Sequence, residues 1–194
     1  MSRKDVDHRG PERIRISGWS GVTARSEVDA ECFRALMTGF PTGVAVLTSR
    51  DAGGRPQGMT CSSLCSVALD PPTLLVCVRR GSTTLTAMLG SGAFAVNLLH
   101  TAGRRAAELF ASSASERFGQ VPWRQGAVQS GPHLIEDAHT VADCAVGECH
   151  AAGDHVVVFG EVRAVTRLSD RAPLLYGQRR YAGWPAPGAD SLCE

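Results

Sequence analysis

The chain has 194 residues, of which 43% are hydrophobic and 20% charged, and its formal net charge is +1. This length favours a single domain with a complete core. The near-neutral charge gives no electrostatic reason to expect binding to nucleic acid or to a membrane surface. No apolar run approaches the roughly 20 residues of a membrane helix. The polar N-terminus shows no secretory signal, so we expect a cytoplasmic protein.

The first 25 residues carry many charges and no hydrophobic period, which predicts a disordered N-terminal arm. Its arginines lack the interleaved aromatic residues of a nucleic-acid-binding segment. Residues 26–38 are predicted to form the first helix, because apolar side chains recur every three or four positions. Ser26 is its expected N-cap and Gly39 its expected end.

The middle of the chain alternates short apolar runs with turn residues. Strands are predicted at residues 44–49, 73–78 and 93–99, with a glycine-containing hairpin turn at 51–54. Residues 60–66 read as a strand rich in small hydroxylated side chains. It is followed by the rigid turn Asp70-Pro71-Pro72, which no helix crosses. Short helices are expected at 83–89 and 101–111.

The last third reads as a polar loop over 112–131 and three further strands, at 140–146, 148–151 and 155–168. Residues 185–194 are predicted to be a frayed tail. Many short strands, few helices and Gly/Pro turns indicate a mainly β (α+β) fold, an antiparallel barrel with short peripheral helices.

The cysteines are odd in number and lack the flanking loops of a zinc site. The close pairs have the spacings Cys-x3-Cys and Cys-x4-Cys. The sequence therefore favours reduced thiols in the core over a metal site or a redox pair. The seven are Cys32, Cys61, Cys65, Cys77, Cys144, Cys149 and Cys193.

Residues 58–84 combine a hydroxyl-rich strand, a double-proline turn, an apolar strand and a basic-hydroxyl helix start. This stretch resembles the short-chain flavin reductases, the reductase partners of two-component flavin monooxygenases. Ser62, Leu64 and Ala68 depart from the family pattern, which has Asn, Phe and Ser there. The matching residues are Thr60, Ser63, Ser66, Val67, Leu69, Asp70, Pro71, Pro72, Arg80 and Ser82.

The resemblance covers roughly residues 31–184 and implies the Greek-key, FMN-binding split barrel, with the domain at 26–184. It also implies a homodimer whose subunits share the flavin clefts. The implied activity is NAD(P)H:flavin oxidoreduction, with hydride passing from NADH (or NADPH) to FAD (or FMN). Reduced flavin would then diffuse to a separate monooxygenase. The alternative is a split-barrel protein that binds flavin or haem without turnover.

Hydride transfer between two cofactors needs no nucleophile and no metal, because the cofactors carry the electrons. Accordingly, the sequence contains no Gly-x-Ser-x-Gly, His-Glu-x-x-His or P-loop motif. The protein's task is to hold two rings face to face.

The family motif implies two groups of flavin contacts. Hydroxyls and backbone N–H groups of the first group would line the isoalloxazine. This group consists of Thr60, Cys61, Ser62, Ser63 and Ser66. Arg80, Ser82 and Thr83 would hold the flavin phosphate, and the alternative for them is a helix cap with a solvated arginine. Asp70 belongs to the motif, although a turn former is the simpler interpretation.

Gly153-Asp154-His155 matches a second family element, in which the histidine lies near the bound nicotinamide. The resemblance implies that His155 orients the nicotinamide, whereas a lone histidine usually belongs to an ordinary turn. Asn97 is expected either to contact flavin or to stabilise the barrel. Tyr176, Arg180 and Tyr181 match a C-terminal element that contacts the nicotinamide dinucleotide or packs on the barrel.

Overall fold

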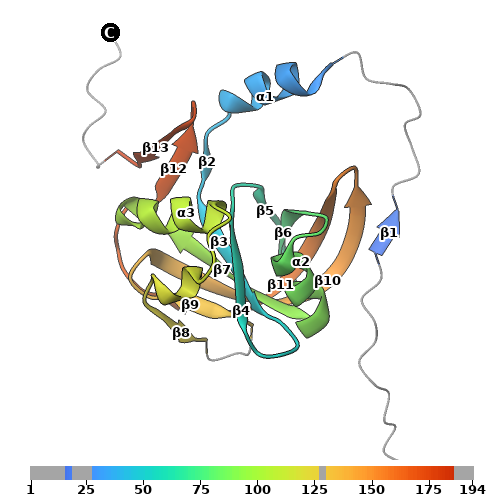
Figure 1. Ribbon diagram of the computed structural model, residues 1–194, viewed down its shortest axis with the longest axis vertical. Coiled ribbons are helices and arrows are strands. Elements are labelled where there is room, and N and C mark those ends of the chain that lie inside the picture. The colour runs from blue at the N-terminus through green and yellow to red at the C-terminus, as the bar shows by residue number, and fades with distance from the viewer. Residues whose placement is uncertain (1–15, 19–27, 127–129, 186–194) are drawn as a thin grey trace, which may run out of the picture.

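A computed structural model describes residues 16–18, 28–126 and 130–185 (Figure 1). The predicted tail lies almost wholly outside these residues, and so does most of the predicted arm. Within the arm, strand β1 (Ile16–Gly18) pairs in parallel with residues Cys149–Ala151 of strand β10 (Ala138–Ala152). Part of the arm is therefore structured. The reason is that β10 has backbone N–H and C=O groups at its edge, with which residues 16–18 can form hydrogen bonds.

The main sheet has the strand order β4-β3-β7-β10-β11-β6-β5, and all of these neighbours are antiparallel. The strands are β3 (Ala45–Arg50), β4 (Pro56–Cys61), β5 (Leu64–Leu69), β6 (Pro72–Arg79), β7 (Ala93–Leu99), β10 (Ala138–Ala152) and β11 (His155–Arg167). The sheet curls until its two edge strands, β4 and β5, are linked through residues 62 and 63 (Figure 1). This is the predicted split barrel, and the predicted strand over 60–66 divides into β4 and β5 at the split.

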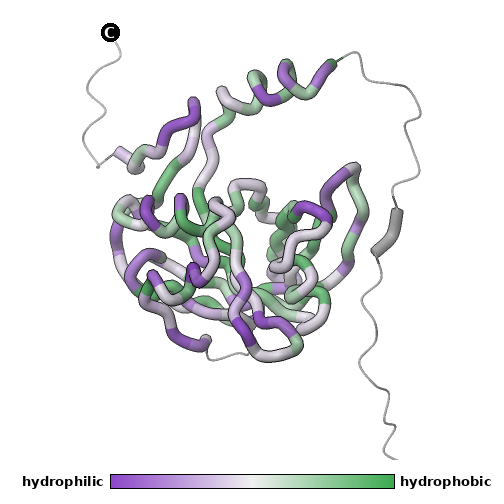
Figure 2. The backbone as a smooth tube through the Cα atoms, in the orientation of Figure 1, coloured by the Kyte–Doolittle hydropathy of each residue, from purple (hydrophilic) through white to green (hydrophobic). Residues whose placement is uncertain are grey.

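Strand β3 shows why some strands are apolar on both faces. Val46 and Leu47 point to opposite sides, and both are fully buried. Leu47 belongs to the barrel interior with Phe94 and Val158, whereas Val46 belongs to a second cluster outside the barrel wall with Phe110. Figure 2 shows the resulting concentration of hydrophobic residues in the inner strands. Burial on both faces explains the continuous apolar runs that predicted these strands.

Within the described ranges, three α-helices border the barrel: α1 (Ala30–Thr38), α2 (Thr83–Ser91) and α3 (Arg104–Ala111). Helix α1 begins later than predicted, since its N-cap is Asp29. The Asp29 carboxylate accepts hydrogen bonds from the backbone N–H of Cys32 at 2.8 Å and of Glu31 at 3.0 Å. These bonds, chiefly the one from Cys32, lower the pKa of Asp29. A carboxylate reaching two N–H groups caps the first turn and adds favourable charge there.

Strand β10 is one strand of 15 residues, not the two that the sequence predicted. Its pairing with β11 shifts register between Val146 and Cys149, where Gly147 and Glu148 lack direct partners. A β-bulge of this kind bends a strand without ending it. The glycine that suggested a break therefore marks a bend in the barrel wall.

Two small sheets accompany the main sheet in the part of the chain that the structure describes, and neither was predicted. One joins β2 (Thr42–Gly43), β12 (Leu174–Gly177) and β13 (Arg180–Gly183), and the other joins β8 (Trp123–Gln125) and β9 (Pro132–Leu134). Two 3-10 turns lie at Thr101–Gly103 and Arg117–Gly119. Among the described residues, no helix has the length and hydrophobicity to cross a membrane.

The cysteines divide between core and surface. Cys61, Cys144 and Cys149 are buried, as predicted, and burial raises the pKa of the Cys144 thiol to about 12. Cys32 and Cys65 are exposed, contrary to the prediction of core thiols. Cys65 lies on β5, the last strand in the order of the main sheet among the described residues. Cys193 lies outside the described residues.

Candidate functional site

The split between β4 and β5 is bridged by Ser62 and Ser63. The Ser63 hydroxyl donates to the carbonyl oxygen of Cys77 at 3.0 Å, and the Cys77 N–H donates to the Ser63 carbonyl oxygen at 3.3 Å. These bonds attach the short link to β6. Both serines are exposed, so the split presents hydroxyl groups on a backbone that is held in place.

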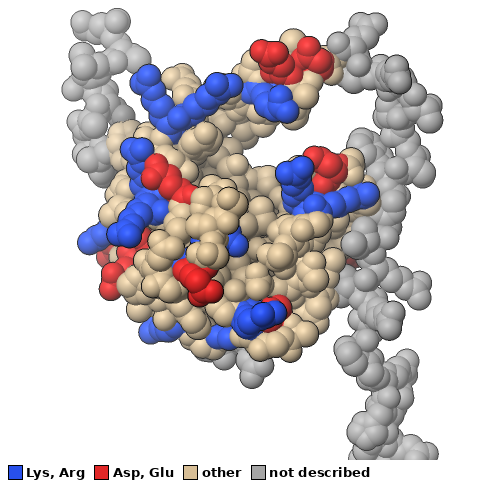
Figure 3. All heavy atoms as spheres, in the orientation of Figure 1, with Lys and Arg blue, Asp and Glu red and all other residues tan. Residues whose placement is uncertain are grey.

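A cleft of about 570 Å³ lies between this link and helix α1; we call it the α1 cleft. Its walls are largely apolar, formed among others by Phe40, Leu75 and Tyr176. Among the described residues that line it, the charged ones are Arg34 and Arg179, and none is an aspartate or glutamate. In Figure 3, arginine side chains (blue) gather around α1 and over β12 and β13, above the hollow beneath the helix. Such a cleft suits a ligand with flat rings and negative charge.

A second cleft of about 540 Å³ lies at the N-terminus of α2; we call it the α2 cleft. Its charged lining consists of Arg79, Arg80 and Arg117. Ser82 is the N-cap of α2, but its side chain makes no capping hydrogen bond, which leaves the N–H groups of the first turn open to a ligand. A helix N-terminus beside guanidinium groups is a favourable environment for phosphate. These residues fit the phosphate of a flavin.

His155 lies next to the α2 cleft, because it pairs with Arg79 across β11 and β6. The Arg80 N–H donates to the Asp154 carbonyl oxygen at 2.9 Å, which fastens the 153–155 turn to the cleft. The His155 Nδ1 lies 2.7 Å from the Asp154 carboxylate, and this hydrogen bond lowers the pKa of Asp154. The imidazole stays 43% exposed.

Strand β6 connects all these features. Ser63 is bonded to Cys77, and Arg79, the partner of His155, lies two residues further along the same strand. Two residues of extended chain span roughly 7 Å, and their side chains share one face. The link at the split, the basic cleft and the histidine therefore lie within the length of one flavin mononucleotide. We regard this as the candidate active site.

Comparison with known proteins supports this reading. Residues 37–185 match the family model of the flavin reductase like domain. The chain belongs to the flavin reductase family. It is 54% identical over 163 residues to a flavin reductase (NADPH) of Lentzea aerocolonigenes, covering 84% of this chain and 95% of that protein.

Two solved structures are also similar to this flavin reductase. The Streptomyces globisporus NADH:FAD oxidoreductase SgcE6, solved with NAD and FAD fragments, has a TM-score of 0.77 and 33% identity, covering 84% of this chain and 96% of that one. BorF, the flavin reductase component of a bacterial two-component tryptophan halogenase, has a TM-score of 0.74 and 30% identity, covering 81% and 99%. The protein is an oxidoreductase that uses NAD(P)H to reduce flavin.

Several residues predicted for the reductase site lie away from both clefts. The Thr60 hydroxyl donates to the Ala107 carbonyl oxygen of α3 at 2.6 Å, so it faces the helix outside the barrel. Cys61 points into the core and is 4% exposed, and burial raises its pKa. Ser66 and Asp70 are exposed, on β5 and at its turn, and line neither cleft. Strand alternation explains this: neighbours in a motif point to opposite faces.

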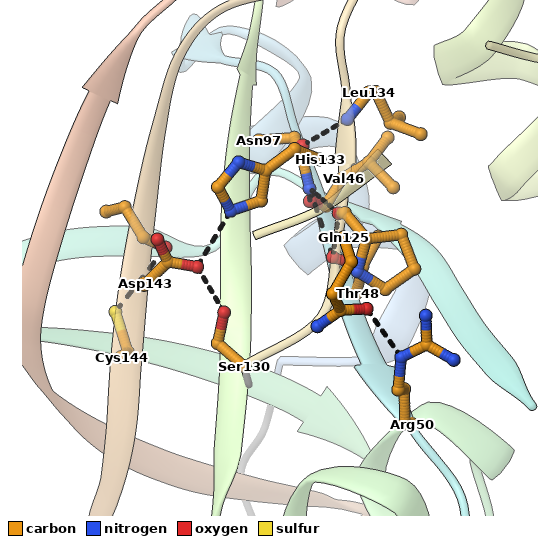
Figure 4. A network of polar contacts seen from close by, with 12 residues as sticks. Val46, Thr48, Arg50, Asn97, Gln125, Ser130, His133, Leu134, Asp143 and Cys144 are labelled. Atoms are coloured by element: carbon orange, nitrogen blue, oxygen red, sulfur yellow. Dashed lines mark hydrogen bonds and ion pairs between the residues drawn. The ribbon is translucent and has the colours of Figure 1, made fainter. Parts of the chain in front are cut away.

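Asn97 is enclosed in the barrel wall and has no exposed surface (Figure 4). Its Nδ2 donates to the Val46 carbonyl oxygen at 3.1 Å and to the Thr48 hydroxyl at 3.2 Å. Its Oδ1 accepts from the Leu134 N–H at 2.8 Å. The amide thus ties β7 to β3 and β9. Of its two predicted roles, the structure favours stabilisation of the barrel. Contact with flavin would require these hydrogen bonds to break and the side chain to become exposed.

The C-terminal tyrosines differ in position. Tyr176 lines the α1 cleft, and its ring centroid lies 5.0 Å from that of Tyr181. Tyr181 is half-buried, and the guanidinium carbon of Arg104 lies 5.6 Å from the centroid of its ring. The pKa of Tyr181 is raised, chiefly because the side chain is buried. Arg180 is exposed and is not among the residues that line the cleft. The predicted coenzyme contact therefore suits Tyr176, with Tyr181 supporting it from behind.

The sequence did not predict four of the arginines that line the clefts, and one of them, Arg79 at the end of β6, is the neighbour of the predicted Arg80. Arg117 reaches the α2 cleft from the 3-10 turn after α3. Arg34 and Arg179 reach the α1 cleft from a helix and from a hairpin turn. No spacing rule links these last three positions, because each is brought to its cleft by chain packing.

Proposed function

We propose that the reductase binds the flavin ring at Ser62 and Ser63, binds the flavin phosphate in the α2 cleft, and uses His155 to orient the nicotinamide. The observation that supports this most strongly is the course of β6, which joins the Ser63 link to Arg79 and its partner His155. The two serines and the α2 cleft would contact the ring and the phosphate of the flavin, and His155 would contact the nicotinamide stacked on that ring.

The bound flavin and nicotinamide would supply the hydride chemistry themselves. The reductase would hold the flavin and the nicotinamide in position for the transfer. Its backbone link at the split is held by β6, with the Ser63 hydroxyl donating to Cys77, so the neighbouring exposed Ser62 would meet a ligand on a backbone that is already in place. The apolar walls of the α1 cleft, including Phe40 and Leu75, would keep water from the stacked rings. Holding reactants at contact distance in this way supplies much of a rate enhancement.

We further propose that FAD is preferred over FMN. A groove of about 510 Å³ adjoins the α2 cleft and shares Thr83 and Arg117 with it. It is lined further by Arg55, Gln57 and Phe118. The adenosine diphosphate half of FAD would extend from the phosphate site into this groove, where the cation, the amide and the ring offer complementary contacts.

The activity is tested by mixing the purified protein with NADH or NADPH and an excess of FAD or FMN without oxygen. We expect the visible absorbance of the flavin to bleach, faster with FAD at low flavin concentration. A protein that binds flavin but leaves it oxidised would overturn the proposed function. Equal KM values for the two flavins would reject only the FAD preference.

Removing a cation from the α2 cleft should weaken flavin binding. We expect Arg80→Ala and Arg117→Ala each to raise the FAD dissociation constant about tenfold, since hydrogen bonds to charged groups contribute at this level. Fluorescence quenching of titrated FAD measures the effect. Arg163→Ala is the matched control, because Arg163 is bonded to Glu161 on the outer wall. Unchanged affinity in the two cleft variants would show that these arginines do not contact the flavin phosphate.

We propose that the reductase is a homodimer. Large apolar side chains are exposed on α1, on β5 and near the end of β11, which is unusual for the surface of a monomer. They include Phe33 (56% exposed), Leu36 (70%), Val67 (45%), Leu69 (91%) and Val165 (65%). A second copy presents the same surface and would cover it symmetrically. Sedimentation at a monomer's mass over a wide concentration range would reject the homodimer.

We also propose that the reduced flavin leaves for a separate, cytoplasmic flavin-dependent monooxygenase. Both clefts open to the surface, and release to a second enzyme requires only moderate flavin affinity. The reductase and a monooxygenase can be separated by a dialysis membrane that passes flavin. Product formation across the membrane is expected, and its absence would mean that the two proteins must touch.

A further inference from the structure

Two cations that border the α1 cleft have no carboxylate partner within the part of the chain that the structure describes. Arg34 comes from the second turn of α1, and Arg179 comes from the turn between β12 and β13. Among the described residues, no aspartate or glutamate pairs with either side chain, whereas Arg55, Arg104, Arg163 and Arg167 all form ion pairs. Two unpaired guanidinium groups at one cleft attract an anionic ligand.

The fold brings these two arginines to the same cleft by a direct backbone contact. The Gln178 N–H donates to the Thr38 carbonyl oxygen at 2.8 Å, which joins the hairpin turn to the last residue of α1. A Cβ atom added to Gly177 would lie only 3.1 Å from the side chain of Pro41, so the hairpin also packs closely on the segment after α1. The position of Arg179 relative to α1 is therefore defined by the fold.

Arg179 occupies an unfavourable backbone conformation. Gln178 has φ = 49° and Arg179 has φ = 58°, both in the left-handed region. Two-residue hairpin turns with positive φ at both positions strongly prefer asparagine and glycine. Residues kept in this conformation despite its cost concentrate at binding sites. The turn thus holds a guanidinium group where a glycine would be easier to accommodate.

We infer that Arg34 and Arg179 bind the 2′-phosphate of NADPH and make the enzyme prefer NADPH to NADH. The inference rests on the proposed function, because it assumes that the nicotinamide coenzyme occupies the α1 cleft. The phosphate is the one group that distinguishes the two coenzymes. It carries close to two negative charges at neutral pH, and paired guanidinium groups bind such a dianion with several hydrogen bonds.

The apolar part of the same cleft suits the remainder of the coenzyme. Tyr176 is 37% exposed and lines the cleft beside Gly177 and Arg179. Its aromatic face is available for stacking with adenine, which would place the adenosine 2′-phosphate next to the arginines. The other end of the coenzyme would extend past Ser63 and Cys77 toward His155.

The kinetic test compares both coenzymes with Arg34→Gln and Arg179→Gly. Glycine at 179 removes the cation and relieves the backbone conformation, so thermal stability should be retained or increased. We expect each variant to raise KM for NADPH about tenfold, as for the loss of a charged hydrogen bond, and to leave KM for NADH within about twofold. Arg167→Gln removes an equal charge from an ion pair with Asp170, and should change neither value.

A binding measurement without turnover completes the test. Calorimetric titration of the purified protein should give tighter binding of NADP⁺ than of NAD⁺, and the two variants should abolish the difference. An equal loss for both coenzymes would assign the arginines to the shared pyrophosphate and overturn the inference. So would an unchanged NADPH preference in both variants. Because flavin reduction by NADH would persist in either case, failure of this inference is distinct from failure of the proposed function.

Discussion

Replacing His155 by alanine is expected to lower kcat for flavin reduction by roughly one to two orders of magnitude, the cost of losing precise orientation of a reactant. The imidazole is 43% exposed and is held by the Asp154 carboxylate at 2.7 Å, so it has one free edge with which to meet a ligand. The flavin dissociation constant should change by less than about twofold, since the phosphate site lies on other residues. Stopped-flow reduction with saturating coenzyme, together with flavin titration, measures both quantities.

The control for this experiment is His150→Ala. His150 is 44% exposed and also lies beside a carboxylate, that of Glu148 at 3.3 Å, but it is on β10 away from the two clefts. We expect its kcat to equal that of the unmodified enzyme. If His155→Ala lost flavin affinity in proportion to turnover, the imidazole would belong to the flavin site or to the fold, not to the nicotinamide.

The second large effect is expected on stability, from Asn97→Ala. This change leaves the Leu134 N–H without its acceptor and removes the donor to Val46 and Thr48, all inside the barrel wall. Each buried polar group left unsatisfied costs about 1–3 kcal/mol, so the free energy of unfolding should fall by about 3 kcal/mol or more. Urea denaturation without flavin measures the loss as a lower midpoint at an unchanged slope.

Gln125→Ala provides the comparison, because Gln125 is also a hydrogen-bonded amide in the network of Figure 4 but is exposed. Its Oε1 accepts from the Arg50 Nε at 2.6 Å, and its removal should change stability by less than about 0.5 kcal/mol. Flavin affinity of folded Asn97→Ala should match that of the unmodified enzyme. A stable variant that no longer binds flavin would instead place Asn97 in the cofactor site.

Local patterns predicted the strands well where burial follows a simple rule. Residues 93–99 were predicted as a strand and form β7, and the Asp70-Pro71-Pro72 turn separates β5 from β6 as expected. Prediction failed where the backbone deviates from regular pairing. The sequence predicts two strands, at 140–146 and 148–151, whereas a bulge at this point allows β10 to continue as one strand. The β12–β13 hairpin escaped notice because its turn is Gln-Arg rather than Asn-Gly.

The sequence by itself determined the fold class and the family, and it pointed to the stretch of chain that carries the candidate site, since turn residues, strand periodicity and the flavin reductase motif are all local. Only the tertiary structure decided which motif residues line the candidate clefts. It turned Thr60 toward α3 and enclosed Asn97 in the barrel wall, while it brought Arg34, Arg117 and Arg179 to the clefts. The physical reason is that a site is made by side chains on different elements, and their meeting depends on curvature, register and packing that no single segment encodes.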